Sequence, residues 1–285
     1  MRRMNERANE AGAVLRRALR ALTEHAPERF GAAAAKWRSG DFVPGSEDLG
    51  PETTRHLEEI IRDGERASVA VEAAAQLLLL LAPVERLGEL FESLADERAV
   101  WLQTVLEQAV ELIPLRGELE ALAPAVREVV SSWDDALVHV EACSFFGATG
   151  RPEGVEYLQD ALAAHPDPLV RMYAAGALAR RPDAWPRLEE ALNDDSDRVR
   201  VVALGCLVEA GRRPWRELLP FLDSGDHIVV IQSCGELVSW TPEDAVGEVV
   251  RRLRAPCDAD PPVSVRDSVE EAIGALEGRK EGVAR

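Results

Sequence analysis

The stretch DPLVRMYAAGALA, at Asp167–Ala179, recurs further along the chain and decides the fold. Three later stretches follow the same pattern: SDRVRVVALGCLV at Ser196–Val208, DHIVVIQSCGELV at Asp226–Val238 and PPVSVRDSVEEAI at Pro261–Ile273. The first valines of the four copies are Val170, Val199, Val229 and Val265, which lie 29, 30 and 36 residues apart. A fixed period of about 30 residues is the sequence signature of an array of stacked structural units.

Each copy has the apolar spacing of an α-helix. With the first valine as position 0, apolar residues occupy positions 4, 7 and 8, as in Ala174, Ala177 and Leu178. These positions share one face of a helix and do not match the alternation of a strand. The third copy is poorer, because Ser233 and Glu236 are polar at positions 4 and 7. Asp, Ser or Pro precedes each helix, where it can cap free N–H groups or preset φ.

Position 6 of the first three copies is glycine: Gly176, Gly205 and Gly235. Glycine inside a helix costs up to about 1 kcal/mol relative to alanine, so its recurrence in phase needs a reason. The sequence predicts that a neighbouring helix or turn approaches closely at each of these positions.

A second, shorter helix is expected between the repeated ones. Proline marks its start, at Pro152, Pro182, Pro214 and Pro242, because proline suits the first helical turn. Each repeat is therefore predicted to be a helix pair. The pattern extends back to Val138, 32 residues before Val170, and fainter copies are expected to start near Val69 and Val100.

Asp-Pro-x-Val-Arg followed by helix-spaced alanine and leucine resembles the HEAT repeat, especially the bacterial HEAT-like repeats also found in phycobilin lyases. The matching residues are Asp167, Val170 and Arg171; Asp194, Val199 and Arg200; and Asp260, Val265 and Arg266. The copy at Asp226 departs from the pattern because Val230 stands where arginine is expected. The resemblance implies an all-α fold, an α-solenoid (armadillo-like superhelix) of helix pairs, and a use as scaffold, adaptor or occasionally enzyme.

The expected organisation runs from a cap to a tail. The boundaries are 1–38 for an N-terminal helical cap, 39–51 for a linker, 52–132 for degenerate helical repeats, 133–276 for HEAT-like repeats and 277–285 for a flexible tail. The cap carries an apolar stripe at helical spacing, formed by Val14, Leu15, Ala18, Leu19 and Leu22. Covering the first repeat is the favoured role of this helix, and docking a partner is the alternative.

Composition limits the partners. The formal net charge of −18 disfavours nucleic acid and anionic membrane surfaces, and it favours a protein partner, a basic one in particular. The longest aliphatic run, Leu77–Leu81, is far shorter than a membrane span requires. The cysteines Cys143, Cys206, Cys234 and Cys257 form no C-x-x-C pair, which predicts free thiols in a reducing compartment. With the resemblance to bacterial repeats, we expect this compartment to be the bacterial cytoplasm.

Acidic residues gather in the turns before the repeated helices, and arginines gather in the opposite turns. The acids with candidate roles are Asp134, Asp135, Asp167, Asp194, Asp195, Asp197, Asp223 and Asp226; the arginines are Arg151, Arg180, Arg181, Arg212 and Arg213. One interpretation is helix capping with surface ion pairs, each worth little. The other is an acidic edge that contacts a basic partner. Met172, Val201 and Ile231, at position 2, are candidates for an inner groove, or for cover by the next repeat.

No catalytic, cofactor or metal site is predicted. The chain has no G-x-S-x-G, no Walker glycine loop and no H-E-x-x-H, and the acids from Asp194 onward lack the glycine and glutamate that a calcium loop requires. The favoured function is therefore a non-enzymatic scaffold or adaptor that binds a protein partner. Two alternatives stay open: an inhibitor or immunity protein that masks a basic toxin, and a HEAT-like enzyme of the bilin-lyase type.

Overall fold

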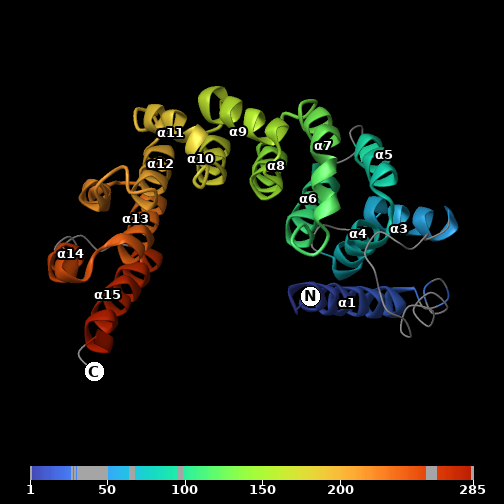
Figure 1. The fold of residues 1–285 in the computed structure, drawn as a ribbon, viewed down its shortest axis with the longest axis horizontal. Helices are drawn as coiled ribbons and strands as arrows, with labels where there is room; N and C mark the ends of the chain where they lie inside the picture. Colours follow the sequence, from blue (N-terminus) through green and yellow to red (C-terminus); the bar gives the residue numbers. More distant parts are fainter. Residues whose placement is uncertain are drawn as a thin grey trace. The chain divides into compact units, whose positions relative to one another are not determined.

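The computed structural model describes residues 2–26, 28, 30, 51–63, 68–94, 99–254 and 262–283, and within these ranges it holds helices and no strand. The α-helices are α1 (Arg2–His25), α3 (Pro51–Asp63), α4 (Val69–Leu81), α5 (Val84–Leu94), α6 (Ala99–Leu112), α7 (Ala123–Val130), α8 (Ala136–Thr149), α9 (Pro152–Ala164), α10 (Pro168–Ala177), α11 (Trp185–Ala191), α12 (Asp197–Glu209), α13 (His227–Trp240), α14 (Val246–Arg254) and α15 (Val263–Val283). The 3-10 helices are η1 (Gly117–Leu122), η2 (Pro182–Ala184), η3 (Trp215–Asp223) and η4 (Glu243–Ala245). The predicted all-α array of helix pairs is confirmed (Figure 1).

The chain forms two compact units, unit 1 at Met1–Tyr157 and unit 2 at Leu158–Arg285. In unit 1 the second helices of successive pairs stack, α4 against α6 and α6 against α8. Helix α1 packs against α4 at the start of this row and buries the apolar stripe that the sequence predicts. This packing is what a cap requires, because the outer face of a terminal repeat would otherwise be open to water.

Burial and spacing together indicate the repeat register in unit 1. Ala74, Leu106 and Val138 are fully buried and lie 32 residues apart, and the Gln76–Gln108 hydrogen bond joins residues at the same spacing, so we assign these three residues to position 0. The register expected near Val69 is wrong, because that residue is 67% exposed. The side chain of Val100, the other expected start, lies outside the described part of the chain.

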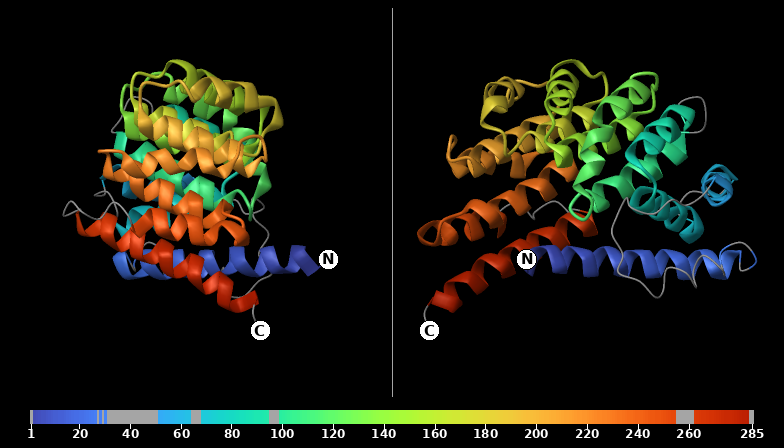
Figure 2. Two further views of the ribbon diagram at one scale, coloured as in Figure 1. Left: turned by 90° about the vertical axis from the view of Figure 1, so that its left-hand side faces the viewer. Right: turned by 45° about the vertical axis from the view of Figure 1, so that its right-hand side comes forward.

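In unit 2 the second helices α10, α12, α13 and α15 carry the repeated stretches, and successive ones pack against each other. The left view of Figure 2 shows them lying one above another. Position 0 is buried in every copy, which confirms the helical face predicted from the sequence. The predicted proline starts also agree: α9 begins at Pro152 and η2 at Pro182, and Pro214 and Pro242 immediately precede η3 and η4.

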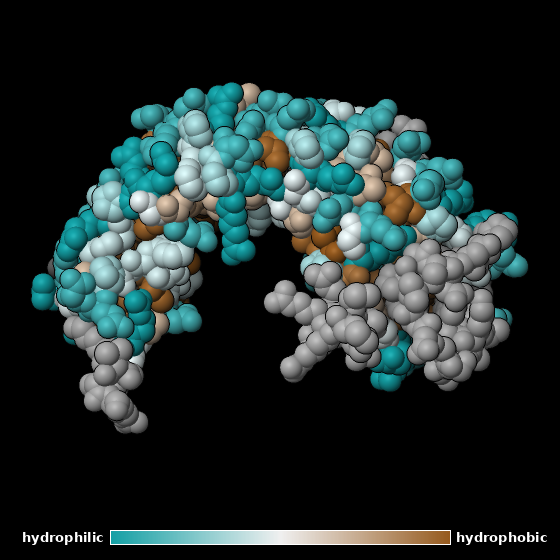
Figure 3. Space-filling model, viewed as in Figure 1, coloured by the Kyte–Doolittle hydropathy of each residue, from teal (hydrophilic) through white to brown (hydrophobic). Residues whose placement is uncertain are grey.

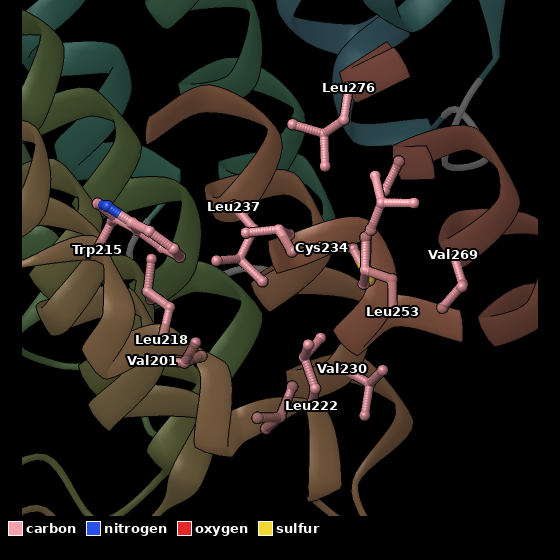
Figure 4. Packing of buried hydrophobic residues seen from close by; sticks show 14 of the residues in the cluster. Val201, Trp215, Leu218, Leu222, Val230, Cys234, Leu237, Leu253, Val269 and Leu276 are labelled. Carbon is pink, nitrogen blue, oxygen red and sulfur yellow. The ribbon is translucent and has the colours of Figure 1, made fainter. Parts of the chain in front are cut away.

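The core of unit 2 lies between the first and second helices of its last pairs. Figure 4 shows Leu237 and Cys234 of α13 between Trp215 and Leu218 of η3 and Val269 of α15. Leu237 and Leu218 have no exposed surface, so the side chains of adjacent repeats form one continuous core. Such sharing between neighbours is how a repeat array buries enough apolar surface, since one helix pair cannot do so alone.

The last helix is longer than the repeat pattern indicates. The sequence predicts a tail from Glu277, but α15 continues to Val283. Arg279 donates hydrogen bonds to the carbonyl oxygens of Val238 (2.6 Å) and Thr241 (2.9 Å), which fastens this extension to the end of α13. Residues 39–50 of the predicted linker, and residues 255–261 before the last helix, lie outside the described residues.

Candidate protein-binding face

Three of the predicted acids cap second helices. The side chains of Asp135, Asp167 and Asp226 each accept a hydrogen bond from the backbone N–H two residues later, at 2.8, 2.8 and 3.0 Å. Such caps satisfy N–H groups that the first turn of a helix leaves without a partner. These carboxylates therefore already have a structural role.

The residue at position 1 fastens the turn before its own helix. Arg171 donates to the carbonyl oxygen of His165 (2.9 Å), and Arg200 to that of Asp194 (2.7 Å). In unit 1, His139 holds the same position and bonds the Trp133 carbonyl oxygen through Nε2 (2.8 Å). Each of these carbonyls belongs to the residue five places before position 0. The repeated side chain thus locks the turn and helix together within one repeat.

Arg171 also ties its repeat to the next one. Its Nε and Nη2 donate to the two carboxylate oxygens of Asp194 at 2.8 and 2.9 Å, and Nη2 reaches Asp195 at 2.5 Å. The Arg171 and Asp194 side chains are only 12% and 11% exposed. Burial opposes ionisation of the Asp194 carboxyl, but the hydrogen bonds from Arg171 and the Ser196 N–H outweigh it and hold its pKa below the usual range.

The ion pair that joins the next two repeats uses an arginine at a different position of the helix. Arg200 pairs with Asp197 of its own repeat, and the link to Asp226 is made by Arg198, whose Nε lies 2.6 Å from the carboxylate. That hydrogen bond holds the pKa of Asp226 below its usual range. The missing arginine at Val230 therefore does not leave Asp226 unpaired, because the preceding repeat supplies Arg198.

Most of the predicted acidic edge is thus engaged by arginine or by a helix terminus. Asp223 pairs with Arg252, and of the eight candidate acids Asp134 is exposed without a hydrogen bond to another described residue. The opposite turns behave similarly: Arg213 pairs with Glu189 (2.6 Å), and the Arg212 guanidinium lies 4.8 Å from the centre of the Trp185 ring. The charges of both edges act mainly between repeats.

The position 2 candidates differ in exposure. Val201 is 1% exposed and belongs to the core, so the next repeat covers it. Met172 is half-buried, and Ile231 is half-buried at the edge of the same core. Of these three, Ile231 also borders an open groove.

Two exposed apolar residues that the sequence analysis did not select lie on the second helices α10 and α13 of unit 2, and a third, Val263, is the first residue of α15. Tyr173 of α10, at position 3, is 42% exposed, and Ile228 of α13, one residue before position 0, is 46% exposed. Positions −1, 3 and 6 share one side of a helix, so these residues lie on the same side as the glycines at position 6. In the sequence, both residues could have been found because they are apolar and lie outside the buried stripe of positions 0, 4, 7 and 8.

The glycines at position 6 are not equivalent. A Cβ atom on Gly205 would lie 2.6 Å from the Glu236 carboxylate carbon, and one on Gly176 would lie 3.8 Å from Val202. A Cβ atom on Gly235 would meet nothing within 4 Å. The close approach predicted for all three is therefore present at Gly205, reduced to ordinary contact at Gly176 and wrong for Gly235.

The open space beside Gly235 is a groove of about 290 Å³ between α13 and α15, called the Gly235 groove below. Its lining is mostly apolar: Ile231, Cys234, Gly235, Val238, Ser268, Glu271, Ala272 and Ala275. In the space-filling view, hydrophobic atoms show among hydrophilic ones over the part of unit 2 built from α13 and α15 (Figure 3).

Two thiols and one imidazole, those of Cys143, Cys206 and His139, have structural surroundings. Burial raises the pKa of the Cys143 and Cys206 thiols to about 12, so neither is a nucleophile at neutral pH. His139 Nδ1 lies 2.6 Å from the Tyr157 hydroxyl and is thereby fixed in the interior of unit 1. Among the described residues no three His, Cys, Asp or Glu side chains come together to hold a metal, and Cys257 lies outside them. Nor is any described helix long and apolar enough to cross a membrane.

The comparison with protein families agrees with this architecture. Residues 119–207 match the family model of HEAT repeats, so this part of the chain consists of HEAT repeats and the predicted resemblance is confirmed. No curated protein matches the sequence. Among solved structures, the crystal structure of Cex1p is similar with a TM-score of 0.38 and 9% identity, over 90% of this chain and 60% of that one. This chain therefore spans less than two thirds of that protein.

Proposed function

We propose that the protein is a non-enzymatic cytoplasmic scaffold or adaptor that binds a protein partner on the second-helix face of unit 2. HEAT repeats generally mediate protein–protein interaction, and the second helices α10 and α13 here each expose one large apolar side chain. The observation that carries the proposal is the exposure of Tyr173 and Ile228 on helices whose other apolar residues are buried or half-buried. Tyrosine and large aliphatic side chains exposed beside glycine are suitable anchors for a partner.

The acidic edge has a smaller part in this proposal than its residue count suggests. Asp194 and Asp226 are held by arginines of the preceding repeat, so their charge is largely compensated. Steering by the net charge of −18 increases the association rate, while the apolar face supplies most of the affinity. Partner binding should therefore persist at high salt, although it forms more slowly.

The test is capture of the partner by the full chain and by the double variant Tyr173→Glu, Ile228→Glu. Both residues are exposed, so the variant should fold and yet lose the partner, since a charge in an apolar contact costs several kcal/mol, on the order of 2–5. The matched control is Ala164→Glu, Asn193→Glu, which adds the same charge at exposed residues outside this face. Equal capture by the wild type and the face variant would refute the proposal, and equal loss in both variants would indicate a charge effect.

A further inference from the structure

The junctions between second helices follow a rule that the last junction breaks. Val202, at position 3 of α12, covers Gly176, and Glu236, at position 7 of α13, covers Gly205. The same two positions of α15 carry Ser268 and Ala272. Both side chains are short, so neither reaches over Gly235, and the Gly235 groove remains open.

The groove combines an apolar floor with an acidic border. Cys234 and Ala272 are 2% and 4% exposed and form the floor, while Ile231 and Val238 are half-buried at the side. Glu271 is the acidic residue that lines the groove, and none of the described residues that line it is basic. A cationic side chain with apolar neighbours is complementary to this lining.

The exposed side of α15 strengthens the acidic border. Asp267, Glu270 and Glu271 are all exposed, and Asp267 and Glu271 are four residues apart on one side of the helix. Like charges at this spacing destabilise a helix by about 0.2–0.5 kcal/mol, so the Asp267–Glu271 pair does not stabilise α15. Arg266 is the one basic residue between Val263 and Leu276 and leaves an acidic excess there.

We infer that the Gly235 groove binds an amphipathic helix of a partner protein, with its apolar residues on Ile231, Val238 and Ala272 and a lysine or arginine beside Glu271. This inference rests on the proposed function and specifies one site and the chemistry of its partner. A groove between two parallel ridges of side chains suits a helix with anchors at positions i and i+3 or i+4. Negative charge along α15 selects a basic helix over an acidic one.

The test measures binding of two labelled synthetic peptides to the full chain by fluorescence anisotropy. Both are amphipathic helices with leucine on the apolar side, and the polar side carries lysine in one and glutamate in the other. The lysine peptide should bind, and the glutamate peptide should bind at least about tenfold more weakly. Equal binding of the two peptides would overturn the inferred chemistry.

Two variants locate the site. Ser268→Leu fills the groove and should weaken binding of the lysine peptide at least about tenfold. Glu271→Lys should weaken binding similarly, and because Glu271 is exposed this change does not disturb the core. The control Glu243→Lys makes the same charge change at an exposed residue of η4 and should leave binding unchanged. Wild-type binding by Glu271→Lys, or an equal loss in Glu243→Lys, would overturn the inference.

The two proposals fail differently. If the Tyr173→Glu, Ile228→Glu variant loses its natural partner and Glu271→Lys keeps it, the scaffold function holds and the groove inference is overturned. If neither variant affects capture while the wild type retains the partner, both are overturned. If both variants lose the natural partner, and binding of the lysine peptide requires Glu271, the scaffold function and the groove inference are both supported.

Discussion

The α12–α13 junction and the α13–α15 junction of unit 2 derive from the same repeat pattern but end differently. At the first, Glu236 fills the space over Gly205, and its carboxylate also accepts hydrogen bonds from Gln232 and Trp240. At the second, Ser268 and Ala272 are too short to fill the space over Gly235. The glycine alone does not define a surface, because the side chain opposite decides whether its space is closed.

The largest difference between the junctions should appear in their position 8 residues. Leu237 of α13 is fully buried, whereas Ile273 of α15 is half-buried. We expect Leu237→Ala to lower the free energy of unfolding by about 2–5 kcal/mol, and Ile273→Ala by about 1–2 kcal/mol, because less apolar surface is lost at the latter. Urea unfolding followed by circular dichroism measures both. Equal losses would mean that α15 is packed as fully as α13.

Much of this fold could be predicted from residue spacing, because position 0 must be apolar wherever helices stack. The repeat register in unit 1 could not be predicted in this way, because α4 is apolar on nearly all sides and its sequence shows no single apolar stripe. Position 2 there even holds a partly buried polar contact, Gln76 Nε2 to Gln108 Oε1 at 2.7 Å, where Val140, Met172, Val201 and Ile231 of the next four repeats are apolar. Such a contact depends on which side chain stands opposite on the neighbouring helix, and the repeat period does not specify that residue.

The site was less predictable than the fold, for a related reason. The in-phase glycines indicated close approach, but whether each is covered depends on positions 3 and 7 of the following helix. Comparing Val202 and Glu236 with Ser268 and Ala272 in the sequence would have separated Gly235 from the others. Similarly, Arg198 lies outside the family motif, so its tie to Asp226 required the structure.

The arginine ties allow the α12–α13 junction to be compared with the one before it, between α10 and α12. The side chains of Arg171 and Asp194 are almost buried, whereas those of Arg198 and Asp226 are 35% and 32% exposed. Arg171→Met should therefore lower the free energy of unfolding by about 1.5–3 kcal/mol, since it leaves a poorly solvated carboxylate without its partner. Arg198→Met should cost below about 1 kcal/mol, because solvent screens that pair. Similar losses in the two variants would contradict this ranking.

The pH dependence of the Arg171→Met effect checks its cause. The pKa of Asp194 is below its usual range in the folded protein, so its contribution to stability is present above the ordinary carboxyl pKa of about 4 and is lost as pH falls below that value. The difference in unfolding free energy between wild type and Arg171→Met should be largest at neutral pH and should decrease towards pH 3. A difference that does not change with pH would assign the effect to packing of the arginine stem.

The smallest effects should come from the glycines themselves, and they should differ in direction. Gly235→Ala adds a methyl group where nothing lies within 4 Å, so the better helix propensity of alanine should stabilise the protein by about 0.5–1 kcal/mol. Gly205→Ala gains the same propensity, but its methyl group displaces the Glu236 carboxylate from Gln232 and Trp240, and these lost hydrogen bonds cancel or exceed the gain. The thermal unfolding midpoint of each variant is the measurement, with Glu236→Ala combined with Gly205→Ala as the control. If removal of Glu236 restores the gain at Gly205, the side chain opposite each glycine is what distinguishes a closed junction from an open one.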